Sequence, residues 1–156
     1  GVATGVRVGN AIGRDDQVGI VRATWVGVGL ATVAMVLIGI IFLVFTEQIV
    51  RVYTTDPGVI AVATTTLFVT AFLLAFDGAQ GVFMAVLRSC GEVWTPVLMH
   101  GLSFWVIAVP LAAWLAFSQQ FGAPGLMGGM FAGVGIACLL LGLRFRWLTR
   151  RPIRRL

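Results

Sequence analysis

Residues 67–87 read LFVTAFLLAFDGAQGVFMAVL, and this stretch decides the fold. It is a long apolar run with one carboxylate, Asp77, and a glutamine, Gln80, three residues later. Side chains three residues apart on a helix lie on the same face. An ionisable group inside a membrane helix costs about 2.5–3.5 kcal/mol on insertion scales and is a functional-site hypothesis by default. If the following Arg88 marks the interface, about 16 Å further along the helix, Asp77 lies near the middle of the ~30 Å hydrocarbon core.

The composition agrees with a membrane location. The chain has 156 residues, of which 59% are hydrophobic and 11% are charged, whereas soluble domains average about 25% charged residues. All the basic residues are arginine, and six of them follow the last apolar stretch: Arg144, Arg146, Arg150, Arg151, Arg154 and Arg155. A basic cluster next to a membrane helix indicates topology and contact with anionic lipids. We therefore predict an all-α membrane protein whose partners are membrane lipids, and no nucleic acid.

The apolar segments predict a polytopic membrane helix bundle. Residues 1–13 are too short to span a bilayer and are interpreted as the end of a helix that starts before Gly1, so we expect the C-terminal part of a longer protein. The four full transmembrane helices are predicted at 17–46, 59–88, 95–117 and 125–148. Asp15 or Asp16 and the Asp56-Pro57 pair mark two of their starts. Residues 1–156 thus form a single membrane domain, with a basic tail at 149–156.

Glycines recur at every fourth position in the first and last of these segments. Small residues at this spacing let membrane helices approach closely. The glycines that we predict to pack helices are Gly1, Gly5, Gly9, Gly13, Gly125, Gly129 and Gly133.

The arginines also predict orientation. Arg51 is the single arginine of the connections at 46–58 and 118–124, and all the others fall in the alternate segments. The positive-inside rule then places the turn at 14–16, the loop at 88–94 and the tail in the cytoplasm. We predict a multi-pass protein of the cell (inner) membrane with a cytoplasmic C-terminus.

The sequence shows no constellation typical of an enzyme or a cofactor site. His100 is the single histidine and has no second ligand at metal-binding spacing, so we interpret it as a helix-contact residue. Asp77 is the single acid within a predicted span, and Thr70, Gln80 and Met84 lie on its side of the helix. This side would suit a cavity wall that binds a cation or a proton. The alternative is a structural carboxyl group that is hydrogen-bonded to a neighbouring helix.

Several short motifs occur in the order that one transporter family shows. They are VRVGNAIG at 6–13, YTTD at 53–56, FDGAQ at 76–80, Leu87-Arg88, and the spacing from Trp105 to Pro110. With them the chain resembles the C-terminal half of the MATE (multidrug and toxic compound extrusion) transporters. It departs from the family pattern at 89–93, where SCGEV replaces Gly-x-Gly-Asp-Thr, and at Phe104, where tyrosine is common.

The resemblance implies a fold of twelve helices in two lobes and a cation-coupled antiporter that exports drugs or other organic cations. Asp77 would match the cation-binding acid of the C-terminal lobe, and would be a metal ligand if Na⁺ rather than H⁺ is the coupling ion. Gln80 would line the cavity, and the N-terminal lobe of the same chain would be the partner. Two alternatives remain open, a lipid-linked glycan flippase of the same superfamily and a non-transporting membrane scaffold that works through its glycine faces.

Overall fold

The computed structural model describes residues 1–150, and every regular element in that range is a helix. The elements are α1 (Val2–Gly13), α2 (Gln17–Tyr53), α3 (Pro57–Ser89), α4 (Trp94–Leu102), η1 (Ser103–Ala108), α5 (Val109–Ala113), η2 (Trp114–Ser118) and α6 (Gly122–Thr149). Four stretches are long and apolar enough to cross a membrane: α2, α3, α6, and the continuous run from α4 to η2. The predicted all-α bundle with four spans is thereby confirmed. The last six residues of the predicted tail, 151–156, lie outside the described part.

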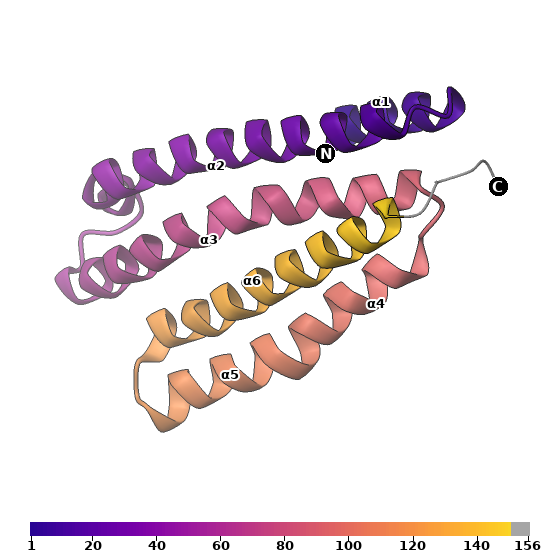
Figure 1. Cartoon of the computed structure of the whole chain (residues 1–156). Helices are drawn as coiled ribbons and strands as arrows, with labels where there is room; N and C mark the ends of the chain where they lie inside the picture. The colour runs from indigo at the N-terminus through magenta and orange to yellow at the C-terminus, as the bar shows by residue number, and fades with distance from the viewer. Residues whose placement is uncertain (151–156) are drawn as a thin grey trace.

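The helices form an open row with α3 near its centre (Figure 1). Helix α2 packs on one side of α3 and α6 on the other, and the α4–η2 run packs against α6. The short α1 contacts both α2 and α3. Since α2 and α6 do not close around α3, two sides of α3 lie open between them, and α1 covers part of one of them.

A buried cluster lies where α1, α2, α3 and α6 meet. Its members share very low exposure and are Val8, Ala11, Ile20, Val82, Phe83, Val86, Leu87, Leu141 and Phe145. Lipid tails are as apolar as leucine, so such a cluster stabilises a membrane bundle by close packing rather than by removal of apolar surface from water.

Aspartates cap two of the long helices, as the sequence predicts. Asp16 Oδ1 accepts a hydrogen bond from the backbone N–H of Gly19 at 2.8 Å, at the start of α2. Asp56 Oδ1 accepts one from the N–H of Gly58 at 2.8 Å, and Pro57 occupies the first turn of α3. Each cap satisfies one backbone donor that a helix start leaves unpaired.

Helix α2 is longer than its prediction. It continues past residue 46 to Tyr53, through non-helical backbone at Phe45 (φ −108°, ψ 17°). A pair of side chains one helical turn apart, Glu47 and Arg51, supports the extra turns, with Arg51 Nε donating to Glu47 Oε1 at 3.0 Å. The connection predicted at 46–58 is therefore wrong in length, since only residues 54–56 separate the two helices. Helix α6 also begins earlier than predicted, at Gly122.

The third span departs from a regular α-helix on both sides of its proline. Pro110 lies in α5, between the π-helical turns η1 and η2. The N–H of Val109 donates to the carbonyl oxygen of Phe104, five residues back. The N–H of Gln119 likewise donates to the carbonyl oxygen of Trp114 at 3.2 Å. Proline has no N–H to donate, and wider turns let neighbouring groups find partners. This span starts at Trp94 without a side-chain cap.

Polar contacts join the helices at the arginine-rich end. Gln17 Nε2 donates to the carbonyl oxygen of Thr149 at 3.1 Å, which links the start of α2 to the end of α6. Arg144 of α6 forms an ion pair with Glu92, and its Nε donates to Glu92 Oε2 at 2.9 Å. The grouping of the arginines at one end is thus a feature of the fold. The assignment of that end to the cytoplasm stays a prediction.

Candidate functional site

Asp77 lies in the interior of α3, on a side that neither α2 nor α6 covers. Its side chain is exposed, and the ion pairs found within residues 1–150 involve other acids, Glu47 and Glu92. None of the hydrogen bonds within that range reaches the Asp77 carboxylate. The described helices therefore give no support to a structural carboxyl group bonded to a neighbouring helix. Among residues 1–150 no three His, Cys, Asp or Glu side chains are placed to hold a metal ion together, so Asp77 would be a single acidic ligand here.

Thr70 and Met84 share the side of Asp77. Each is seven residues away, which places it about 20° around the helix axis from Asp77. Both are half-buried, and the Thr70 hydroxyl donates to the carbonyl of Thr66 at 2.9 Å. Gly81, on the same side, is exposed. The open side thus carries a carboxylate between a hydroxyl and a thioether, and their role as cavity-lining residues stays a prediction.

Gln80 occupies a different environment. It is 3% exposed, and its amide Nε2 contacts Nδ1 of His100 on α4. A separation of three residues turns an α-helix by 300°, so Gln80 lies about 60° around the helix axis from Asp77. That rotation is sufficient to move it from the open side into the contact between α3 and α4. The structure therefore does not bring Gln80 to the exposed surface that carries Asp77.

The amide oxygen of Gln80 has no hydrogen-bond partner in the described part of the chain. Among the buried side-chain polar atoms of residues 1–150, Gln80 Oε1 is the one that lacks a hydrogen bond. An unpaired buried acceptor costs about 1–3 kcal/mol. A proton donor or a cation that reached it would therefore be stabilised.

His100 is a helix-contact residue, as predicted. Besides Gln80, it contacts the ring of Phe104, with the two ring centroids 4.9 Å apart. Its pairing with Gln80 was not predicted. The signal was available in principle, because polar side chains on apolar membrane helices tend to bond to each other across helices.

The glycine predictions have mixed outcomes. A methyl group added at Gly125 would lie 2.9 Å from the backbone of Leu115. At Gly129 and Gly133 it would overlap Ala112 and Ala108, so this row packs α6 against the third span. In α1, a methyl at Gly1 would lie 3.3 Å from the Gly81 oxygen of α3, and at Gly5 it would lie 3.0 Å from Ser89 Oγ. Gly13 ends the helix and is half-buried. At Gly9 a methyl group would meet nothing within 4 Å among residues 1–150, so the packing role of Gly9 stays a prediction.

The loop between α3 and α4 holds two further groups that sequence reasoning missed. Glu92 pairs with Arg144, whose guanidinium also lies over the ring of Trp147 at 4.5 Å from its centroid. Burial raises the pKa of the Cys90 thiol to about 11, and the Glu92 carboxylate contributes to the increase. This thiol is therefore protonated at neutral pH and is a poor nucleophile.

The fold and the site together define a class: a multi-pass helical membrane protein in which a spanning helix carries a carboxylate that no side chain of residues 1–150 pairs with. An intramembrane acid of this kind is typical of ion and substrate pathways.

Comparison with known proteins identifies the family. The model of the MatE family matches residues 1–114, so the chain belongs to the MatE family. A protein of Xanthomonas campestris pv. campestris is 36% identical over 149 residues, which cover 96% of this chain and 32% of that protein. A protein of Caulobacter vibrioides is 34% identical over 149 residues, which again cover 96% of this chain and 32% of that protein. One of Synechococcus sp. is 36% identical over 153 residues, 95% of this chain and 33% of that protein.

Each of these three relatives bears the name "probable multidrug resistance protein NorM". The chain spans about a third of their length.

Proposed function

We propose that these helices belong to a cation-coupled antiporter that exports drugs or other organic cations across the cell membrane, with Asp77 as the residue that binds the coupling ion, Na⁺ or H⁺. The observation that carries the proposal is the position of Asp77, a carboxylate without an ion-pair partner among residues 1–150, in the interior of a spanning helix in a member of the MatE family. The names of the relatives support the substrate class.

The chemistry of the open side supports this role. A carboxylate near the middle of a membrane binds a cation or a proton when one is available, because its charge is costly there without a partner. Binding from the outside and release to the cytoplasm would let the inward gradient reset the cavity for outward export. Thr70 and Met84 would line the surface along which the substrate passes. The rest of the cavity would come from segments outside these 156 residues, since the matched region is about a third of the relatives' length.

The distribution of the arginines supports the proposed orientation. The arginine-rich end, with the α3–α4 loop and the end of α6, would face the cytoplasm, and the connections at 54–56 and 119–121 would face outward. Transport chemistry of this kind requires no enzyme activity and no bound cofactor besides the coupling ion.

The test is ethidium efflux from vesicles that contain the intact gene product, with Na⁺ and H⁺ gradients imposed separately. Asp77→Asn keeps the size of the side chain and its hydrogen-bonding capacity but removes the charge. We expect gradient-driven efflux to fall to background in this variant at equal expression, and the gradient that drives the unmodified protein identifies the ion. Glu47→Gln, which alters an exposed acid outside the open side, is the matched control and should transport normally. Unchanged efflux by Asp77→Asn would refute the role of Asp77.

A further inference from the structure

A groove lies on the other open side of α3, away from Asp77. Small residues of α3, Ala75 and Ala79, form its floor. Trp25 and Val28 of α2 form one wall, and α6 forms the other from Cys138 to Arg146. Its volume is about 400 Å³. Ala79 is two residues from Asp77, and two residues turn a helix by 200°, so the groove points nearly opposite to the carboxylate.

The groove has the length and the polarity of a lipid-chain site. From Cys138 to Arg146 is eight residues, or about 12 Å along the helix. One leaflet is about 15 Å deep, half of the ~30 Å hydrocarbon core, so the groove covers most of one leaflet. Apart from Thr32 and Arg146, its lining carries apolar side chains, cysteine or glycine. A hydrocarbon chain would therefore be in contact with protein along most of one leaflet.

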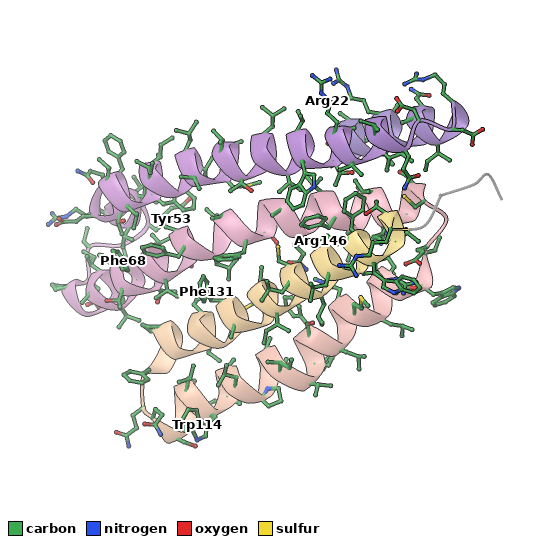
Figure 2. All side chains as sticks on the ribbon, in the orientation of Figure 1. Arg22, Tyr53, Phe68, Trp114, Phe131 and Arg146 are labelled. Carbon is green, nitrogen blue, oxygen red and sulfur yellow. The ribbon has the colours of Figure 1, made fainter. Side chains whose placement is uncertain are left out.

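One end of the groove carries a positive charge. Arg146 is exposed and lies three residues before the end of α6 at Thr149 (Figure 2). Within residues 1–150 the ion pairs are Glu47 with Arg51 and Glu92 with Arg144, so Arg146 has no acidic partner in this range. Trp25 lies in the same groove, edge-on to Phe83 with ring centroids 6.0 Å apart. Arginine and tryptophan are the residues that anchor a helix at the level of lipid headgroups.

We propose that this groove binds one acyl chain of an anionic phospholipid whose phosphate contacts Arg146. The Arg146 guanidinium, which has no acidic partner among residues 1–150, favours an anionic headgroup and disfavours the organic cations of the proposed transport cycle. The site is separate from Asp77, and the proposal does not depend on the proposed function.

Native mass spectrometry of the purified intact gene product tests this proposal, with phosphatidylglycerol and phosphatidylcholine of identical chains offered in turn. We expect one saturable phosphatidylglycerol site, filled at lower concentration than phosphatidylcholine. Arg146→Gln should weaken the phosphatidylglycerol affinity about fivefold, the effect of one basic residue near a lipid surface. Arg88→Gln is the matched control, because Arg88 is also exposed near this end of the bundle. Arg88 follows Asp77 by eleven residues, which places it only about 20° around the helix axis from Asp77 and therefore on the side away from the groove. The Arg88→Gln variant should bind like the unmodified protein.

A second variant tests the apolar part of the site. Gly142 lies in the groove wall, where a methyl group would be 3.5 Å from the Phe83 ring. Gly142→Leu should fill the groove and abolish the saturable site. Gly101→Leu should leave the site intact, because a methyl group at Gly101 on α4 would meet no atom of residues 1–150 within 4 Å.

Alkylation of Cys138, followed by peptide mass spectrometry, gives a readout in unmodified protein. Since Cys138 lines the groove, saturating phosphatidylglycerol should slow its reaction, and phosphatidylcholine at the same concentration should slow it less. Three results would overturn the proposal. They are equal binding of both lipids, equal phosphatidylglycerol affinities of Arg146→Gln and Arg88→Gln, and a Cys138 alkylation rate that does not depend on phosphatidylglycerol. The absence of a saturable site would also overturn it, and is the result expected if another segment of the protein covers the groove.

Discussion

The two halves of α6 contact their neighbours in different ways. The first half, 122–133, presents Gly125, Gly129 and Gly133 to the third span, so that the two backbones nearly touch. The second half, 137–149, instead places Leu141 and Phe145 in the buried cluster, at 0% and 1% exposure. It also makes the ion pair with Glu92.

The difference shows two solutions to one physical problem. In a bilayer, apolar surface is not driven out of water, so helices associate through close packing and polar contacts. The first half achieves contact by omitting side chains, and the second half by interlocking large ones. The first half should therefore be sensitive to added atoms, and the second to removed atoms or charges.

The largest effect is expected for Gly129→Leu. The leucine side chain would overlap the backbone of Ala112 and separate α5 from α6. We expect this to lower the free energy of unfolding by about 3 kcal/mol or more. We expect a loss of folded, monodisperse protein in size-exclusion chromatography. The matched control is Gly135→Leu on the same helix, where a methyl group would meet no described atom within 4 Å. If both variants unfold alike, the close backbone contact is not what makes the first half sensitive.

Phe145→Ala should have the next largest effect. The ring is 1% exposed, and the Phe83 ring lies 6.1 Å away between centroids. Removing it leaves a cavity in the cluster, which costs about 3–5 kcal/mol for a buried phenylalanine. Thermal unfolding in detergent would detect the loss. An unfolding temperature close to that of the unmodified protein would show that the cluster repacks, and would remove the contrast between the halves.

Glu92→Gln should cost less, about 1–3 kcal/mol, because it leaves the half-buried Arg144 guanidinium without its carboxylate. The control is Glu47→Gln at the opposite end. The Glu47 side chain is 59% exposed, against 16% for Glu92, so we expect a loss below about 0.5 kcal/mol. The comparison is made by thermal unfolding at low and high salt. Equal losses in the two variants would mean that the contact between Glu92 and Arg144 adds nothing to the second half.

The smallest effect concerns reactivity. Because burial, with Glu92 contributing, raises the pKa of Cys90 from its ordinary 9.0 to about 11, maleimide labelling of folded protein should be slow at pH 7. Its rate should rise until about pH 11, whereas the rate in denaturant should level off near pH 9. Because folding favours the neutral thiol, protonated Cys90 contributes to the free energy of unfolding. This contribution is complete below pH 9 and is lost as the pH rises towards 11. A folded-state plateau near pH 9 would contradict this.

Much of the fold could be predicted from the sequence, because long uncharged runs and capping aspartates are local signals. The ends of helices were harder to predict. Helix α2 passes beyond residue 46 through a segment in which Glu47 and Arg51 pair one turn apart. Hydropathy alone makes such a polar segment resemble a loop. The π turns beside Pro110 depend on which distant carbonyl each N–H finds, and no composition signal specifies that choice.

The candidate site was predictable only in part. Asp77 stands out because it is a charge in an apolar helix, but the environment of Gln80 depends on a 60° rotation and on the position of α4. Its partner, His100, is twenty residues away in sequence. Gly9 shows the converse, since a regular spacing does not determine which glycine has a neighbour.

The π turns of the third span have a consequence for how this region tolerates insertions and deletions. A π turn holds one residue more than the α-helical turn it replaces. Deleting one residue within 104–107 would convert η1 into α-helix and would leave the contacts of Ala108 and Ala112 with α6 in register. The same deletion within α5 would rotate every later side chain by about 100°. Natural variation in the length of this span should therefore be concentrated at η1 and η2, while the segment that faces the glycines of α6 keeps a constant length.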